Sequence, residues 1–224
     1  MSPNPSSGTL SKGRRTFGHM LLIKKYWWLH ALIVGVISVT GLIALGVWTY
    51  SSAPPLVDYV SSSTGETVIP QRQIQRGKEV FHLKGLMTYG SFWGDGGERG
   101  PDYTAEAMHH TYVSMNKYYE NEIAKDRPVT QADRDMIMAR VRREMRANGH
   151  DESAGIIRIN EAQVFAYQEL ITHYTRTFTD ATYEEAFMKG RIQNHISNPE
   201  DLKALAGYFF WGGWVSAATR PGEV

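Results

Sequence analysis

Apolar and polar positions divide the chain into one continuous apolar segment followed by a series of amphipathic ones. From Trp27 to Tyr50 the only strongly polar side chain is that of His30. An apolar run of about 20 residues spans the hydrocarbon core of a bilayer as a helix. The pattern therefore predicts a transmembrane helix near the N-terminus.

Residues that favour the membrane interface flank this run. Aromatic residues lie at both of its ends: Trp27, Trp28, Trp48 and Tyr50. Lys24 and Lys25 precede it, and positive flanks stay in the cytoplasm. We expect a cytoplasmic tail at 1–25, an anchor at 26–50 and an extracytoplasmic, periplasmic or extracellular domain at 51–224. A cleaved signal peptide is the alternative, but the apolar run is longer than a typical signal and the prolines after it disfavour cleavage.

Helical periodicity recurs after the anchor, so the fold class is mainly α. Apolar stripes and capping residues predict helices near residues 71–84, 102–123, 130–149, 160–174 and 198–218. In the first of these, Ile74, Lys78 and Phe81 lie near one face. Residues 64–70 have the pattern of a short strand or hairpin, and residues 155–159 that of a short strand. Residues 177–198 form a looser stretch with room for one short helix.

Composition narrows the class of protein. The chain has 224 residues, 42% of them hydrophobic, with a formal net charge of +1, which suits one folded domain with an appendage and gives no indication of nucleic-acid binding. Its cysteine count of zero excludes disulfides, thiolate metal sites and covalent attachment of c-type haem through C-x-x-C-H.

A glycine-rich loop at residues 85–106 carries the first candidate chemistry. Its glycines permit unusual backbone conformations and close approach of another surface. Asp95, Glu98 and Asp102 place carboxylates among exposed carbonyls, the oxygen-rich setting that calcium prefers. The alternative is a surface turn with solvated acids.

Two other features leave alternatives open. His109 and His110 are adjacent, so they point about 100° apart on a helix and do not ligate one metal together; each is a single ligand, or a packed or solvated side chain. Arginines at 140, 142, 143 and 146 form either an anion-docking surface for lipid headgroups or a partner, or a solvated helix face.

The last predicted helix is unusually apolar. Residues 204–218 combine glycine and alanine with large aromatic side chains, and this stretch is too short to span a bilayer. Such a composition suits close packing against another helix or the bilayer surface. We therefore expect the domain to end in a docking helix.

Two motifs resemble one protein family. The segment from Gly90 to Glu106 is similar to the G-S-x-x-G-x-G-A-Y-x-A-P-D-[WY]-T-A-[DE] segment of quinol-dependent nitric oxide reductases. The segment from Phe209 to Gly222 resembles that family's F-F-x-W-x-x-W-x-[AS]-x-T-x-R-P. The motifs come in the family's order behind an anchor in the expected place, and the resemblance extends from about Lys24 to the C-terminus.

The resemblance implies a cytochrome-c-like helical domain without haem c. In this family such a domain accompanies a catalytic membrane unit that holds haem b and non-haem iron and reduces two nitric oxide molecules to nitrous oxide with electrons from quinol. The chain is then a small subunit or the N-terminal part of a longer one, since the family's pattern continues beyond Val224. It carries no catalytic residue of its own, because haem and iron ligation needs clustered histidines on membrane helices.

The resemblance also implies an interface with calcium. The family's glycine carbonyl and tyrosine that meet calcium beside the haem propionates fall on Gly96 and Glu98. Glutamate here replaces tyrosine, and a carboxylate is the stronger calcium ligand. Arg99 and Arg220 are candidates for pairing with propionates or carboxylates, and we assign the following residues to the same interface: Asp102, Phe210, Trp211 and Trp214.

Two other functions fit the same pattern. One is a membrane-tethered binding or assembly module unrelated to nitric oxide, which docks through its loop and aromatic tail. The other is the equivalent domain of a nitric oxide dismutase, because changes at the iron site leave no trace in this domain. Haem and iron in the purified complex would distinguish a nitric oxide reductase subunit from the tethered module. Analysis of the reaction products would distinguish it from the dismutase domain.

Overall fold

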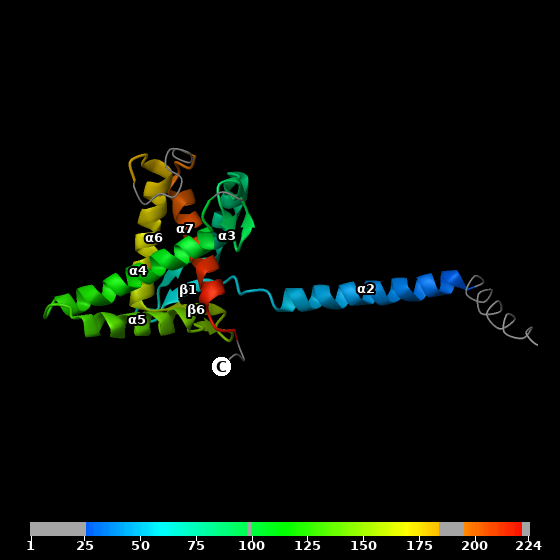
Figure 1. Cartoon of the computed structure of the whole chain (residues 1–224), viewed down its shortest axis with the longest axis horizontal. Helices are drawn as coiled ribbons and strands as arrows, with labels where there is room; N and C mark the ends of the chain where they lie inside the picture. The colour runs from blue at the N-terminus through cyan, green and yellow to red at the C-terminus, as the bar shows by residue number, and fades with distance from the viewer. Residues whose placement is uncertain (1–25, 98–99, 184–194, 221–224) are drawn as a thin grey trace, which may run out of the picture. The chain divides into compact units, whose positions relative to one another are not determined.

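The computed structural model describes residues 26–97, 100–183 and 195–220. It divides into two compact units, residues 1–54 and 55–224. In the first unit, α2 (Trp27–Ser51) is long and apolar enough to cross a membrane. None of its residues is buried. The continuous apolar pattern thus forms one helix (Figure 1). Its apolar residues are distributed over every face of this helix.

The second unit is a mainly helical domain, as the periodicity predicts. Its helices are α3 (Gln71–Leu83), the 3₁₀ turn η1 (Leu86–Thr88), α4 (Tyr103–Ala124), α5 (Gln131–Arg146), α6 (Glu161–Thr179) and α7 (Pro199–Ala217). Its strands are β1 (Asp58–Ser61), β2 (Thr67–Ile69), β3 (Ser91–Phe92), β4 (Asp95–Gly96), β5 (His150–Asp151) and β6 (Ile156–Ile159). The further short helix expected within 177–198 falls partly on residues 184–194, outside the described residues.

Predicted helix starts are confirmed at the level of single hydrogen bonds. Thr130 and Asp133 form a reciprocal capping box on α5, and Asn160 and Gln163 form another on α6. Asn198 caps α7 by accepting from the Glu200 amide. These local bonds satisfy amides that have no partner within the helix.

The small sheet has the strand order β2-β1-β6-β5. β1 pairs antiparallel with β2 and parallel with β6, with Tyr59 opposite Ile157. The β2 and β6 strands were predicted, whereas β1 and the parallel pairing were not. A parallel pair requires a long crossover connection, so its register depends on the packing of everything between the two strands.

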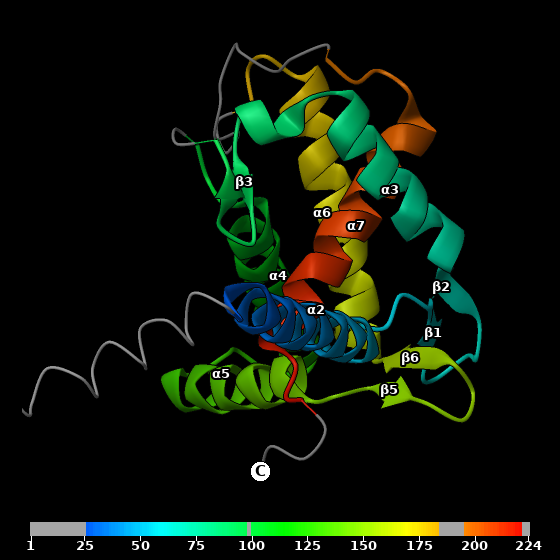
Figure 2. The same ribbon diagram turned by 90° about the vertical axis from the view of Figure 1, so that its right-hand side faces the viewer.

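Helix α7 is the centre of the domain. It packs against α3, α4 and α6, and Figure 2 shows it between α6 and α3. Every residue from Ala204 to Gly213 is buried. The apolar composition of this helix is therefore explained by the core of the domain itself.

Helix α3 approaches α7 through a glycine. A side chain at Gly77 would place Cβ 2.1 Å from the carbonyl oxygen of Ala204, so only glycine allows this contact. The prediction that Lys78 lies on the buried face of α3 is wrong, because Lys78 is exposed. Ile74, Val80 and Phe81 are buried, as the helical period predicts. The contact between α3 and α7 is thus made at Gly77, the residue next to Lys78.

Candidate functional site

The glycine-rich loop forms a tight hairpin. β3 and β4 pair antiparallel with Phe92 opposite Asp95, which leaves Trp93 and Gly94 as the turn. Both have positive φ, 57° and 78°, as a two-residue type I′ turn requires. Glycine suits this conformation, but a bulky residue such as tryptophan rarely adopts it.

Asp102 fastens the hairpin to the start of α4. Its Oδ1 accepts from the Ala105 amide at 2.9 Å, while Oδ2 accepts from the Ser91 hydroxyl at 2.7 Å and the Gly94 amide at 2.6 Å. Burial by itself would raise the pKa of Asp102, but these hydrogen bonds outweigh burial and hold its pKa below the usual value. Asp102 therefore acts as an ionised clamp between the hairpin and the helix.

The hairpin is also seated on α7. The Phe92 ring stacks on Tyr208 with centroids 4.4 Å apart, and the Trp93 indole nitrogen donates to the Gly212 carbonyl at 3.3 Å. Trp93 nevertheless remains 47% exposed. The two sequence motifs that lie far apart along the chain thus meet in one structure with an exposed aromatic tip.

The predicted calcium ligands are only partly described. Gly96 is exposed on β4 beside this tip. Glu98 and Arg99 lie outside the described residues. The pairing of Gly96 and Glu98 on one ion therefore remains a prediction.

The aromatic residues assigned to an interface have different environments. Phe210 and Trp211 are 5% and 8% exposed, and the Trp211 indole donates to the Pro55 carbonyl at 3.0 Å. Trp214 is partly buried and meets Tyr59 edge to face at 6.1 Å. Phe210 and Trp211 thus serve the core of the domain, so Trp93 and Trp214 offer more aromatic surface to a partner.

Arg220 belongs to a basic region at the end of α7. Thr219 donates from both its amide and its hydroxyl to the Arg146 carbonyl at 2.9 Å, which fixes the C-terminal segment on α5. The exposed arginines of this region are Arg142, Arg143, Arg146 and Arg220. None of them forms an ion pair with another residue in the described ranges, so their charges are available to an anionic partner.

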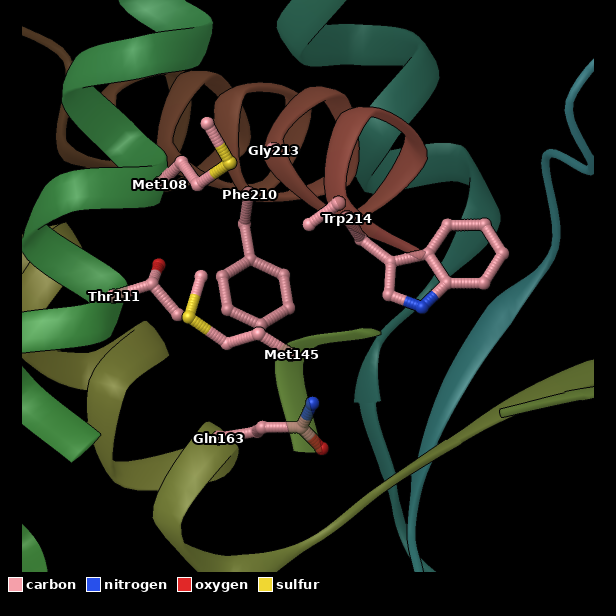
Figure 3. Close-up of a pocket in the computed structure, with 8 residues that line it drawn as sticks. Met108, Thr111, Met145, Gln163, Phe210, Gly213 and Trp214 are labelled. Carbon is pink, nitrogen blue, oxygen red and sulfur yellow. The ribbon is translucent and has the colours of Figure 1, made fainter. Parts of the chain in front are cut away.

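One cavity lies between α7 and the neighbouring helices. Met108 and Met145 approach it from α4 and α5, and Phe210 and Trp214 from α7 (Figure 3). Its volume is about 20 Å³, enough for about one water molecule. It is too small for an organic substrate.

A cluster that the sequence reasoning missed lies between α4 and α6. The ligand atoms of Glu106, His110 and His173 are all within 4.8 Å of one another. From the sequence, His110 was considered only together with its neighbour His109, but the residue that shares a helix face with His110 one turn away is Glu106. This spacing of four residues was a usable signal, whereas His173 comes from a distant helix.

These features define the class of protein: a helical domain with an exposed hairpin, preceded in the sequence by a helix able to cross a membrane. The sequence model of the cytochrome c-like domain of the nitric oxide reductase NorB family matches residues 57–224. The chain therefore belongs to this family, and its domain is cytochrome c-like. No curated protein matches the sequence.

Proposed function

We propose that this chain is the haem-less small subunit, or the N-terminal part, of a quinol-dependent nitric oxide reductase. In this role it docks on a catalytic membrane unit that holds haem b and non-haem iron and reduces two nitric oxide molecules to nitrous oxide in denitrification. The membership of residues 57–224 in the family supports this role. The domain itself supplies binding and stabilisation, and the partner supplies the chemistry.

Two observations support a domain that carries no c-type haem. The chain has no cysteine for covalent attachment. In addition, the Phe81 ring lies 5.7 to 5.9 Å from the rings of Phe92, Tyr103, Tyr208 and Phe209, so aromatic side chains fill the interior between α3, α4 and α7. Such a domain does not relay electrons from cytochrome c, which favours quinol as the donor to the catalytic unit.

The observation that carries the docking role is the strained and exposed tip of the hairpin. Trp93 keeps a positive φ of 57° although glycine or asparagine would adopt it at lower cost. Backbone strain of this kind persists where the surroundings enforce it, and it is concentrated at functional sites. An exposed, preorganised tryptophan is a typical anchor for a protein interface.

Calcium completes the proposed interface. The Gly96 carbonyl and the Glu98 carboxylate supply oxygen ligands, and the catalytic unit supplies the others. Arg99 and Arg220 pair with haem propionates or carboxylates across the same contact, since guanidinium donates in a bidentate fork. The exposed arginines around Arg146 extend this basic surface.

The anchor sets the proposed location. Helix α2 spans the cytoplasmic membrane with the basic N-terminal tail in the cytoplasm, and the domain lies on the periplasmic or extracellular side. There it is next to the membrane lipid and the catalytic unit.

The test is to purify the complex from native membranes through a tag on this chain. We expect haem b, iron and calcium, and nitrous oxide as the product. Trp93→Ala should reduce recovery of the catalytic unit at least 10-fold, while Val113→Ala, which removes an equally exposed side chain on α4, should leave it unchanged. Glu98→Ala should lower calcium content, with Glu152→Ala as the control.

Each other result identifies an alternative. A colourless chain that is monodisperse without a partner would overturn the proposal in favour of an independent anchored module. Dinitrogen and oxygen as products would instead identify a dismutase.

A further inference from the structure

The cluster of Glu106, His110 and His173 joins two helices that pack side by side. Glu106 and His110 lie one turn apart on α4, so they share a face. His173 comes from α6, which packs against α4 and crosses it at an angle in Figure 1. The His173 side chain is 4% exposed and that of Glu106 is 10% exposed. His110 is partly exposed, so the cluster is reached from solvent on its side.

We propose that Glu106, His110 and His173 bind a divalent transition-metal ion, with Zn²⁺ as the best-suited probe. This inference does not rest on the proposed function. Two imidazole nitrogens and one carboxylate oxygen form the ligand set of many three-ligand zinc sites. Calcium and magnesium prefer oxygen alone, which separates this site from the calcium interface.

The distances suit a single ion. Nε2 of His173 lies 3.0 Å from Oε1 of Glu106, and two ligands about 2.05 Å from one metal are about 2.9 to 3.4 Å apart at angles between 90° and the tetrahedral value. The widest separation in the cluster is at most 4.8 Å. Rotation of the partly exposed His110 ring about χ2, a broad torsion, closes this difference.

The His110 ring is already placed against its partner. The centroids of the His110 and His173 rings are 3.7 Å apart, and their planes are inclined by 32°. A metal ion lies in the plane of each neutral imidazole that binds it, so the His110 ring must turn about χ2 and open this contact before both rings share one ion.

Neighbouring tyrosines hold two of the ligands in position. Nδ1 of His173 is 2.8 Å from the Tyr183 hydroxyl, so Nε2 is the nitrogen turned toward Glu106. The Tyr174 hydroxyl donates to Oε2 of Glu106 at 3.3 Å, leaving Oε1 toward His173. Hydrogen bonds of this kind orient metal ligands and raise affinity. Three protein ligands leave the fourth position of a tetrahedral ion open to water.

The experiment uses the full chain in detergent after treatment with a chelator. We expect one equivalent of Zn²⁺ by calorimetry and elemental analysis. At a 100-fold excess over the dissociation constant it should raise the melting temperature by about 5 to 10 °C. An equal concentration of Ca²⁺ should neither raise the melting temperature nor displace Zn²⁺. Co²⁺ in place of Zn²⁺ should give the visible absorption of a four-coordinate ion.

Matched variants attribute the binding to this site. Glu106→Gln keeps the shape and a hydrogen-bond acceptor, and His110→Ala changes the more exposed histidine, so neither should unfold the chain. Each should weaken Zn²⁺ binding at least 10-fold, whereas His109→Ala, which changes the adjacent exposed histidine, should not. Equal Zn²⁺ uptake by wild type and by the double variant Glu106→Gln/His110→Ala would overturn the proposal. So would no uptake by the wild type, which would leave a hydrogen-bonded histidine and glutamate pair without a metal.

Discussion

Phe92 and Tyr208 stack with their ring centroids 4.4 Å apart and their planes inclined by 12°. This contact joins the hairpin to α7 one residue before the second family motif begins, and the hydrogen bond from Trp93 to Gly212 joins the two motifs directly. Trp93, the next residue, also contacts α7 through Trp211 and Gly212 but keeps nearly half of its surface exposed. The hairpin thus combines one ring that stabilises the domain with one that is available to a partner.

Phe92→Ala should separate these two roles. Phe92 is 6% exposed, and truncating a buried phenylalanine costs about 3 to 5 kcal/mol through lost burial and a cavity. Unfolding of the full chain by denaturant, followed by near-UV circular dichroism, measures this loss. Trp93→Ala should cost about 1 kcal/mol or less. Similar losses in the two variants would refute the division of roles.

Gly77→Ala should weaken the packing of α3 on α7. Its Cβ would lie 2.1 Å from the Ala204 carbonyl oxygen, so the helices must move apart at a cost of about 2 to 3 kcal/mol. Gly207→Ala is the comparison on α7, because its Cβ would meet side-chain atoms rather than backbone: Nε2 of Gln73 at 3.1 Å and Cγ2 of Ile69 at 3.2 Å, each of which needs to shift only by a few tenths of an ångström. The gain in helix propensity, about 1 kcal/mol, should keep the control near wild-type stability in the same denaturant titration.

Asp102→Asn should loosen the hairpin without unfolding the domain. The amide cannot accept from Ser91, Gly94 and Ala105 as the carboxylate does, and hydrogen bonds to a charged group contribute about 1.5 to 3 kcal/mol. Hydrogen exchange should therefore speed up at the Gly94 amide by about 10-fold or more. Amides in the middle of α6 serve as the internal control. Unchanged exchange at Gly94 would show that α7 alone holds the hairpin.

Asp151 should contribute to the acid sensitivity of the small sheet. Hydrogen bonds from the Ser153 hydroxyl and the Ala154 amide, together with Arg158, lower its pKa to about 2. A carboxyl whose pKa is lower in the folded state stabilises the protein above its unfolded pKa of about 4. That contribution is lost as the pH falls from about 4 to about 2.

Unfolding of Asp151→Asn at several pH values tests this window. The variant should be less stable than the wild type at pH 7, and the difference should shrink steadily below pH 4. Asp126→Asn, which changes an exposed aspartate, should not show the same trend. A difference that stays constant down to pH 2 would contradict the assigned cause.

The sequence by itself determined the elements whose physical causes are local. The apolar run of α2, the helical periods of the domain and the caps at Thr130, Asn160 and Asn198 depend on residues within a few positions of one another. For this reason they could be predicted, and the structure confirms them. The two family motifs could also be recognised in the sequence, because each is a continuous segment.

Tertiary structure alone decided the relationships between distant segments. It paired β1 with β6, seated the hairpin on α7 and placed His173 beside Glu106 and His110. It also buried Phe210 and Trp211 in the core, although their apolar character alone was equally consistent with a docking surface. Composition tells how strongly a side chain avoids water, but only the packing of the whole domain decides which surface covers it.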